Sequence, residues 1–172
     1  PEPLPEHLHE ISNFIKNNRV DVGFVVDPEV DRLAIVMENG ELFGEESTLV
    51  AVADYILQHK KGNTVSNLSS TRALRDISEK YGVQYATAAV GEVNVVEKMK
   101  EVNAIMGGEG NGGVIYPALH YGRDALVGVA LFLSYLAKCK KKCTEIKASL
   151  PTYFIAKNKI SIPTQCSPNQ LF

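Results

Sequence analysis

The sequence contains no tryptophan, few aromatic side chains (8%) and only three cysteines in 172 residues. The cysteines, Cys139, Cys143 and Cys166, are odd in number and lack metal-site spacing. We therefore expect reduced thiols, which excludes a disulfide framework and a cysteine-based zinc centre. The chain length and a hydrophobic content of 45% allow one good core or two small ones.

Long apolar runs and an excess of one charge are also absent. A net charge of -2 gives no case for nucleic acid, and the short lysine cluster at residues 138–142 is typical of a solvated helix end. No run reaches membrane-span length and the N-terminus lacks signal-peptide anatomy, so we expect a cytoplasmic protein without membrane contact. Because the chain opens at Pro1 without an initiator methionine, we also expect a piece of a longer protein.

The residues that are present follow an α/β pattern. Apolar runs of strand length alternate with segments of helical periodicity, which predicts a mixed, mostly parallel sheet with helices on both faces, preceded by a partial α/β domain. Asn39-Gly40 is typical of a hairpin turn, and Ser69-Ser70-Thr71 offers a helix N-cap. The predicted helices are 6–17, 46–58, one with Leu74 and Ile77, 93–99 and 123–138; the predicted strands are 22–26, 33–37, 64–68, 83–88, 104–106, 114–116 and 150–157, before a linker at 161–172.

Three carboxylates interrupt the apolar pattern between strands 22–26 and 33–37. Asp27, Glu29 and Asp31 are two residues apart, so their side chains can converge in a curved loop and repel one another unless a cation is bound. Oxygen ligands without histidine or cysteine favour Mg²⁺, Mn²⁺ or Ca²⁺ over Zn²⁺. An EF-hand is excluded, because an apolar strand follows where that loop needs glycine. A solvated acidic turn is the alternative.

A glycine-rich segment, residues 107–113, follows a later strand and contains the letters of a dinucleotide-binding motif. The residues after it do not begin a helix, and no acid stands at the required distance, which argues against a nicotinamide or flavin site. We expect a flexible loop close to a small polar ligand, with Glu109 and Asn111 bonding hydroxyl groups, as suits a sugar. A solvated connector is the alternative.

These two segments resemble motifs of one family, the α-D-phosphohexomutases, in the phosphoglucomutase/phosphomannomutase branch. The acidic loop, DPEVDR at 27–32, is similar to its metal loop D-x-D-x-D-R, and GEGNG at 108–112 is similar to its sugar-binding loop G-E-x-[SN]-G. Residues 90–99 and 121–126 also resemble family sequences. The resemblance covers about residues 1–157, in the family's order.

The resemblance implies a four-domain enzyme of which this chain is a part. Residues 1–42 would be the C-terminal part of domain 2 with the metal loop, and residues 43–148 would be domain 3 with the sugar-binding loop. Residues 149–172 would be a linker toward an absent domain 4. Neither the phosphoserine motif of domain 1 nor the phosphate loop of domain 4 is found in the sequence.

The implied reaction interconverts hexose 1-phosphate and hexose 6-phosphate by phosphoryl transfer from the phosphoserine. Hexose 1,6-bisphosphate would be the intermediate and activator. One Mg²⁺ per site would be held by Asp27, Glu29 and Asp31, and Arg32 would stabilise phosphate. Glu109 and Asn111 would bind the sugar. We expect this chain alone to be inactive; the alternative is a non-catalytic module that binds a cation or a sugar phosphate.

The sequence departs from the family's pattern at several positions. Glu29 stands where the family usually has Asp, Ala89 where several members have a lysine proposed as general base, and Gly113 where many have histidine. His120 either replaces that histidine or is a turn residue beside the next helix. An aspartyl phosphatase is disfavoured, because Asp31 stands where that motif needs Thr or Val.

Overall fold

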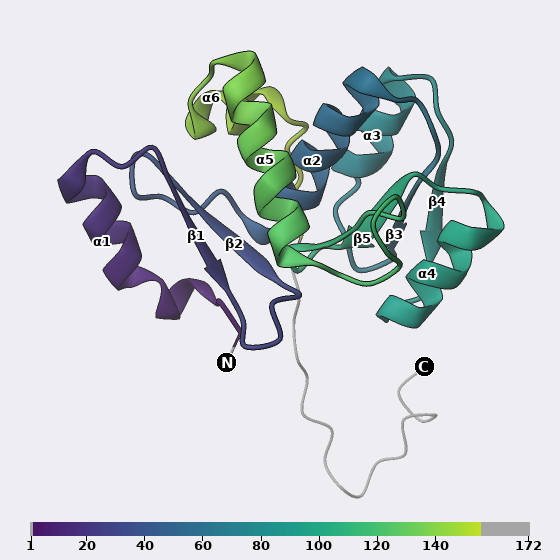
Figure 1. Ribbon diagram of the computed structural model, residues 1–172, viewed down its shortest axis with the longest axis horizontal. Coiled ribbons are helices and arrows are strands. Elements are labelled where there is room, and N and C mark those ends of the chain that lie inside the picture. The colour runs from purple at the N-terminus through teal and green to yellow at the C-terminus, as the bar shows by residue number, and fades with distance from the viewer. Residues whose placement is uncertain (1, 156–172) are drawn as a thin grey trace, which may run out of the picture.

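The computed structural model describes residues 2–155 (Figure 1). A 3-10 turn, Pro5–His7, leads into helix α1, His9–Asn18. Strands β1, Val22–Val26, and β2, Leu33–Met37, form an antiparallel ribbon at the predicted residues, with Val22 opposite Met37 and Val26 opposite Leu33. The loop at 27–32 is thereby the tip of this ribbon, and the turn at 38–40 is its other end.

The second part is a four-stranded sheet in the order β4-β3-β5-β6, in which β3 pairs in parallel with β4 and β5, and β6 is antiparallel to β5. The mixed, mostly parallel α/β fold is therefore confirmed. The strands are β3 Thr64–Asn67, β4 Tyr85–Ala88, β5 Met106–Glu109 and β6 Gly113–Ile115; the helices are α2 Glu45–His59, α3 Ala73–Lys80, α4 Glu92–Glu101, α5 Ala125–Cys139 and α6 Cys143–Ser149.

Helices cover both faces of this sheet. Helices α2, α3 and α5 lie over one face and α4 over the other (Figure 1). Neighbouring strand residues point to opposite faces, so Val114 joins the core under α2 and α5 while Ile115 joins the smaller core under α4. Among residues 2–155, no helix is both long and apolar enough to cross a membrane.

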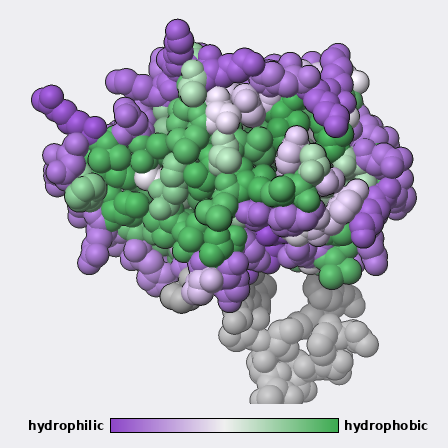
Figure 2. All heavy atoms as spheres, viewed as in Figure 1, coloured by the Kyte–Doolittle hydropathy of each residue, from purple (hydrophilic) through white to green (hydrophobic). Residues whose placement is uncertain are grey.

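The β1–β2 ribbon packs into the larger of these cores through β2. Leu33 and Ile35 are buried with Phe43, whose ring centroid lies 5.0 Å from that of Phe132 on α5. One core therefore spans residues on both sides of the predicted boundary at 42/43, and that boundary stays a prediction. In contrast, β1 is only half-buried, and Figure 2 shows apolar side chains gathered over α1, β1 and α5 on this face.

Several local predictions were wrong. Residues 150–155 form no strand; they contact α3 instead, where the Tyr153 hydroxyl donates to Asp76 Oδ2 at 2.6 Å. The rest of that prediction, like the linker at 161–172 and Cys166, lies outside the described residues. The N-cap of α3 is Arg72, although the Thr71 hydroxyl accepts a hydrogen bond from the Ala73 amide at 3.3 Å. Helix α6 was not predicted. It begins where the Glu145 carboxylate accepts from the Lys142 amide at 2.7 Å.

The prediction that residues 107–113 form a flexible loop was also wrong. Its first half belongs to β5, which is paired on both edges, and only residues 110–112 form a turn before β6. The difference arises because backbone hydrogen bonds from two neighbouring strands, which the local sequence does not reveal, hold the glycines extended.

Candidate active site

The acidic loop follows β1 and is fixed at both ends. Asp27 is only 6% exposed, and its Oδ1 accepts hydrogen bonds from the backbone amides of Asp31 at 3.1 Å and Arg32 at 3.2 Å. Val30 has a left-handed φ of 57°, which is rare for a β-branched residue. Its carbonyl accepts from the Ala125 amide at 3.0 Å. The loop is thus curved around Asp27 and attached to the start of α5.

Asp27, Glu29 and Asp31 line one pocket with Glu2, Arg32 and Arg123. The Asp27 and Asp31 carboxyl groups are close enough to affect each other's pKa. Burial and the neighbouring Asp27 carboxyl group raise the pKa of Asp31; burial would also raise the pKa of Asp27, but hydrogen bonds, first from the Arg32 amide, lower it. Two acids of the loop are therefore neighbours in one pocket.

Glu29 does not complete this pair. It is exposed and lies on the rim of the same pocket. Among residues 2–155, no three histidine, cysteine or acidic side chains are arranged to hold a metal ion. The three predicted metal ligands therefore line one pocket. Asp27 and Asp31 lie together, and Glu29 stands apart from them.

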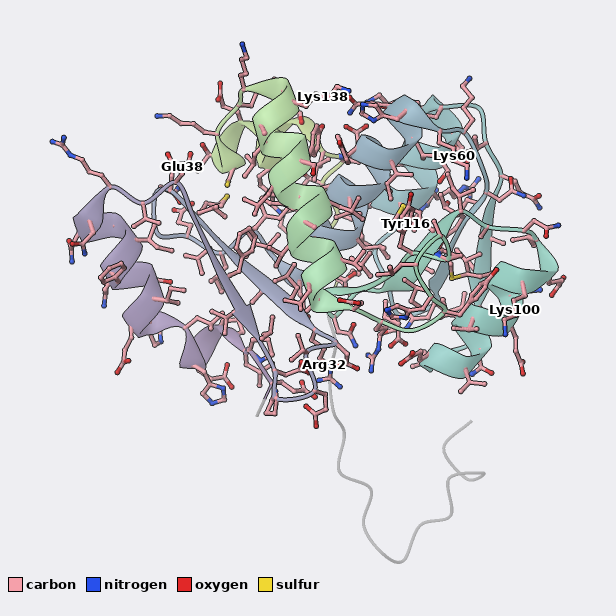
Figure 3. All side chains as sticks on the ribbon, viewed as in Figure 1. Arg32, Glu38, Lys60, Lys100, Tyr116 and Lys138 are labelled. Atoms are coloured by element: carbon pink, nitrogen blue, oxygen red, sulfur yellow. The ribbon has the colours of Figure 1, made fainter. Side chains whose placement is uncertain are left out.

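Arg32 lies at the tip of the ribbon, near the first turn of α5 (Figure 3). Its Nη1 pairs with Glu2, and its Nε is 3.8 Å from Asp27 Oδ2. This Nε is buried and has no hydrogen-bond partner within the described part of the chain. The side chain consequently keeps one donor that an oxygen-rich ligand in the pocket can use.

The turn between β5 and β6 packs directly on the ribbon. Gly112 has a φ of 83°, and a Cβ atom there would overlap the backbone of Leu33, the first residue of β2. Asn111 closes the turn, since its Oδ1 accepts from the Gly113 amide at 3.2 Å. The predicted sugar-binding segment and the predicted metal loop are therefore neighbours, although about 80 residues separate them in sequence.

Glu109 lies at the end of β5 and is 6% exposed. Its Oε1 accepts from Asn67 Nδ2 at 2.6 Å and from the Gly91 amide at 3.2 Å, and its Oε2 accepts from Arg123 Nη1 at 2.9 Å. It is thus held at the carboxyl ends of β3, β4 and β5, where ligands bind in such sheets. A carboxylate has about four acceptor positions, so the three bonds leave one for a ligand hydroxyl.

Sequence reasoning missed Arg123 as a site residue. Its side chain is 13% exposed and pairs with three acids: Asp31, Glu92 at 3.1 Å and Glu109 at 2.9 Å. These acids come from the acidic loop, the start of α4 and the end of β5. No local pattern reveals a contact between residues so far apart in sequence. Arg123 joins all three segments at one point.

A sequence model described as phosphoglucomutase/phosphomannomutase, alpha/beta/alpha domain III, matches residues 44–154. The chain belongs to this family. A phosphoglucomutase/phosphomannomutase of Thermococcus kodakarensis is 33% identical over 160 residues, which cover 92% of this chain and 35% of that protein. A phosphoglucosamine/phosphogalactosamine mutase of Sulfurisphaera tokodaii is 31% identical over 165 residues, which cover 94% and 36%.

Solved structures agree with this phosphohexomutase fold. The crystal structure of a putative phosphomannomutase from Thermus thermophilus superimposes with a TM-score of 0.80 at 27% identity, covering 86% of this chain and 34% of that one. The chain spans about a third of the length of the curated relatives that it matches.

The structure gives a physical reason for one departure from the phosphohexomutase pattern. A Cβ atom at Gly113 would lie 2.5 Å from Cδ of Arg123, so the arginine fills the space that a side chain at position 113 would need. His120 lies in the turn before α5, where its Nε2 is 2.9 Å from Oδ2 of Asp124, the helix N-cap. Ala89 is exposed after β4 and offers no titratable group.

Proposed function

We propose that this chain supplies the metal loop and the sugar-binding turn of a phosphohexomutase that interconverts hexose 1-phosphate and hexose 6-phosphate. The observation that carries the proposal is the contact between the two loops: Asp31 of the acidic loop and Glu109 beside the glycine turn pair with the same arginine. Because one arginine side chain spans the gap between Asp31 and Glu109, the phosphate group and the sugar ring of one small substrate could be held by the two loops at once.

The donors of the acidic loop fit Mg²⁺. They are carboxylate oxygens only. The Asp27 and Asp31 carboxylates line the same pocket and repel each other when both are charged, and a divalent cation relieves that repulsion. Asp27, Glu29 and Asp31 would hold the ion, with Glu29 moving in from the rim. When bound, Mg²⁺ offsets negative charge on a transferring phosphoryl group.

The other side chains would orient the substrate. Arg32 would donate to phosphate oxygens, since its Nε is buried without a partner among residues 2–155. Glu109 would accept from a sugar hydroxyl through its remaining acceptor position, and the Asn111 amide would contact the same ring. Hydroxyl contacts of this kind allow a bisphosphate to be held in either of two orientations.

The rest of the enzyme would come from other domains. Residues 1–42 would be the C-terminal part of domain 2, residues 43–148 would be domain 3, and residues 149–172 would lead toward domain 4. The nucleophile would be a phosphoserine of domain 1, and hexose 1,6-bisphosphate would be the intermediate and activator. This chain alone would then bind ligands but turn nothing over, and its parent would be cytoplasmic.

The names of relatives define the substrate class without selecting one member. They include a phosphoglucomutase/phosphomannomutase and a phosphoglucosamine/phosphogalactosamine mutase. These sugars differ at C2 or C4, so the substrate of this chain's parent would be a hexose or hexosamine phosphate.

A graft tests the proposal. Residues 1–155 would replace the corresponding third of the Thermococcus kodakarensis relative, and mutase activity would be measured with glucose 1-phosphate, Mg²⁺ and glucose 1,6-bisphosphate. We expect activity in the graft, at least a hundredfold loss on Asp31→Ala, roughly as for removal of a charge-stabilising group, and no activity in the isolated chain. A folded graft that is inactive, or one insensitive to Asp31→Ala, would contradict the proposal.

A further inference from the structure

Arg123 makes contacts that the proposed substrate roles do not require. Its Nε donates to Glu92 Oε2 at 3.1 Å, its Nη1 to Glu109 Oε2 at 2.9 Å and its Nη2 to Asp31 Oδ2. Its backbone amide also donates to Glu92 Oε1 at 3.2 Å. With 13% of the side chain exposed, the guanidinium is enclosed by these acids and faces the pocket at the acidic loop.

This arrangement needs an arginine at that position. The three carboxylates approach from three segments, and only a planar guanidinium offers donors in three fixed directions at once. A lysine supplies the same charge at one point and cannot span them. The path of the side chain depends on Gly113, because a Cβ atom there would lie 2.5 Å from Arg123 Cδ.

The acids around Arg123 outnumber it, so its bonds are exchangeable. Asp31 pairs with the Arg123 guanidinium and lines the same pocket as Asp27 and Glu29. Anything that engages Asp31 Oδ2 competes with Arg123 Nη2. The guanidinium would then be held by Glu92 and Glu109 alone, and the two remaining charge-assisted bonds would tighten.

We propose that Arg123 is a positioning residue that transmits the state of the metal loop to Glu109. The coupling is between Asp31 and Glu109, and its use in catalysis rests on the function proposed above. In that setting, occupation of the metal loop adjusts the carboxylate that receives the sugar, so cation and sugar binding are linked through one side chain.

The first test needs no metal. In the wild-type chain, Asp31→Asn should shift the NMR signals of the Gly91 amide and the Asn67 side-chain amide, which both donate to Glu109. The same substitution in an Arg123→Gln background should shift only its own loop. Equal remote shifts in both backgrounds would overturn the proposal.

Two further variants distinguish the guanidinium fork from simple charge or misfolding. Arg123→Lys keeps the positive charge but lacks the planar guanidinium, so Asp31→Asn should shift the Gly91 and Asn67 amide signals no more in this background than in Arg123→Gln. Remote shifts as large as those in the Arg123 chain would show that the guanidinium is not required. Gly113→Ala leaves every acid and the arginine in place but displaces the Arg123 side chain, and it should abolish the remote shifts as well. Transmission that survives in a folded Gly113→Ala chain would overturn the proposed path.

Added Mg²⁺ separates this inference from the proposed function. Wild type should show saturable shifts at residues 27–32, at Gly91 and at the Arg123 Nε resonance, whereas Arg123→Gln should show only those at 27–32. If Mg²⁺ shifts nothing while the Asp31→Asn coupling persists, the metal assignment fails and the coupling stands. If Mg²⁺ shifts Gly91 equally in Arg123→Gln, the coupling role of Arg123 fails.

Discussion

Two charged clusters in this molecule have opposite composition. In the helix layer, the carboxylate of Asp54 accepts from Lys80 Nζ and the Tyr81 hydroxyl, each at 2.9 Å, from the Tyr135 hydroxyl at 2.5 Å and from Gln58 Nε2 at 3.2 Å. At the strand ends, the arrangement is reversed, since one guanidinium donates to three carboxylates. The first cluster is one acid among donors, and the second is one base among acids.

The difference is the one expected between a structural cluster and a candidate binding site. Asp54 is 4% exposed and joins α2, α3 and α5; burial would raise its pKa, but the bonds from Tyr135, Lys80 and Tyr81 lower it. All of its acceptor positions are used. Around Arg123 the acids are in excess, a charge imbalance that costs stability and is typical of sites completed by a ligand.

The largest effect expected is on the Asp54 cluster. Asp54→Ala leaves buried hydroxyl groups without an acceptor and should lower the free energy of unfolding by about 3 kcal/mol. Urea denaturation measures this. Asp76→Ala, which removes a carboxylate bonded to the hydroxyl of the exposed Tyr153, is the matched control and should cost about 0.5 kcal/mol or less. Similar losses in the two variants would erase the distinction between the clusters.

The contact between the two loops at the strand ends is tested by Gly112→Ala. This change adds a left-handed strain and a collision with the Leu33 backbone, and should cost about 2 kcal/mol. Gly82 also has a positive φ, 68°, but a Cβ atom there meets nothing within 4 Å. Gly82→Ala should therefore cost only about 1 kcal/mol. If urea denaturation shows equal losses of unfolding free energy for Gly112→Ala and Gly82→Ala, the turn at residues 110–112 is not in close contact with the β1–β2 ribbon.

Acid should destabilise the fold through Asp54, because the pKa of its carboxyl group is lowered in the folded chain. The unfolded chain takes up the Asp54 proton near pH 4, whereas the folded chain does so only at lower pH. The stabilisation is thus present above about pH 4 and lost as pH falls through the folded pKa, by at most about 1.4 kcal/mol per pH unit. The stability difference between wild type and Asp54→Asn should shrink between about pH 5 and pH 2. A constant difference would contradict a lowered pKa.

The smallest effect expected is at Lys80. Its side chain is 58% exposed, so the ion pair with Asp54 is screened by water although the carboxylate is buried. Lys80→Met should cost about 0.5 kcal/mol in urea denaturation, because the hydroxyl groups still satisfy Asp54. A loss as large as that of Asp54→Ala would show that the charge, and not the hydroxyl bonds, holds the cluster.

The sequence predicted elements whose signal is local. Strands 22–26 and 33–37 were placed correctly because apolar runs end sharply at the acidic loop and the Asn-Gly turn. The helix predicted at 46–58 is observed at 45–59, since its periodicity is complete within the segment. Helix α6 was missed because it is short and polar, with Cys143 and Ile146 as its buried residues.

The candidate site was predictable only in part. The pattern of acids identified Asp27, Glu29 and Asp31, and the structure places them around one pocket; their roles stay predictions. The strand position of Glu109 and its bond to Asn67 depend on pairing between β3 and β5, which the local sequence does not encode. Arg123 was missed for the same reason, because its partners lie up to 92 residues away.

The central claim, that the acidic loop is a cation site, is tested most directly by titrating this chain with Mg²⁺ while following the backbone amides of residues 27–32 by NMR. Two variants accompany wild type: Asp31→Ala, and Asp21→Ala as a control, since Asp21 is an exposed acid just before β1. We predict saturable shifts in wild type and Asp21→Ala and none in Asp31→Ala. Absence of saturable shifts in folded wild type, or equal shifts in Asp31→Ala, would contradict the account.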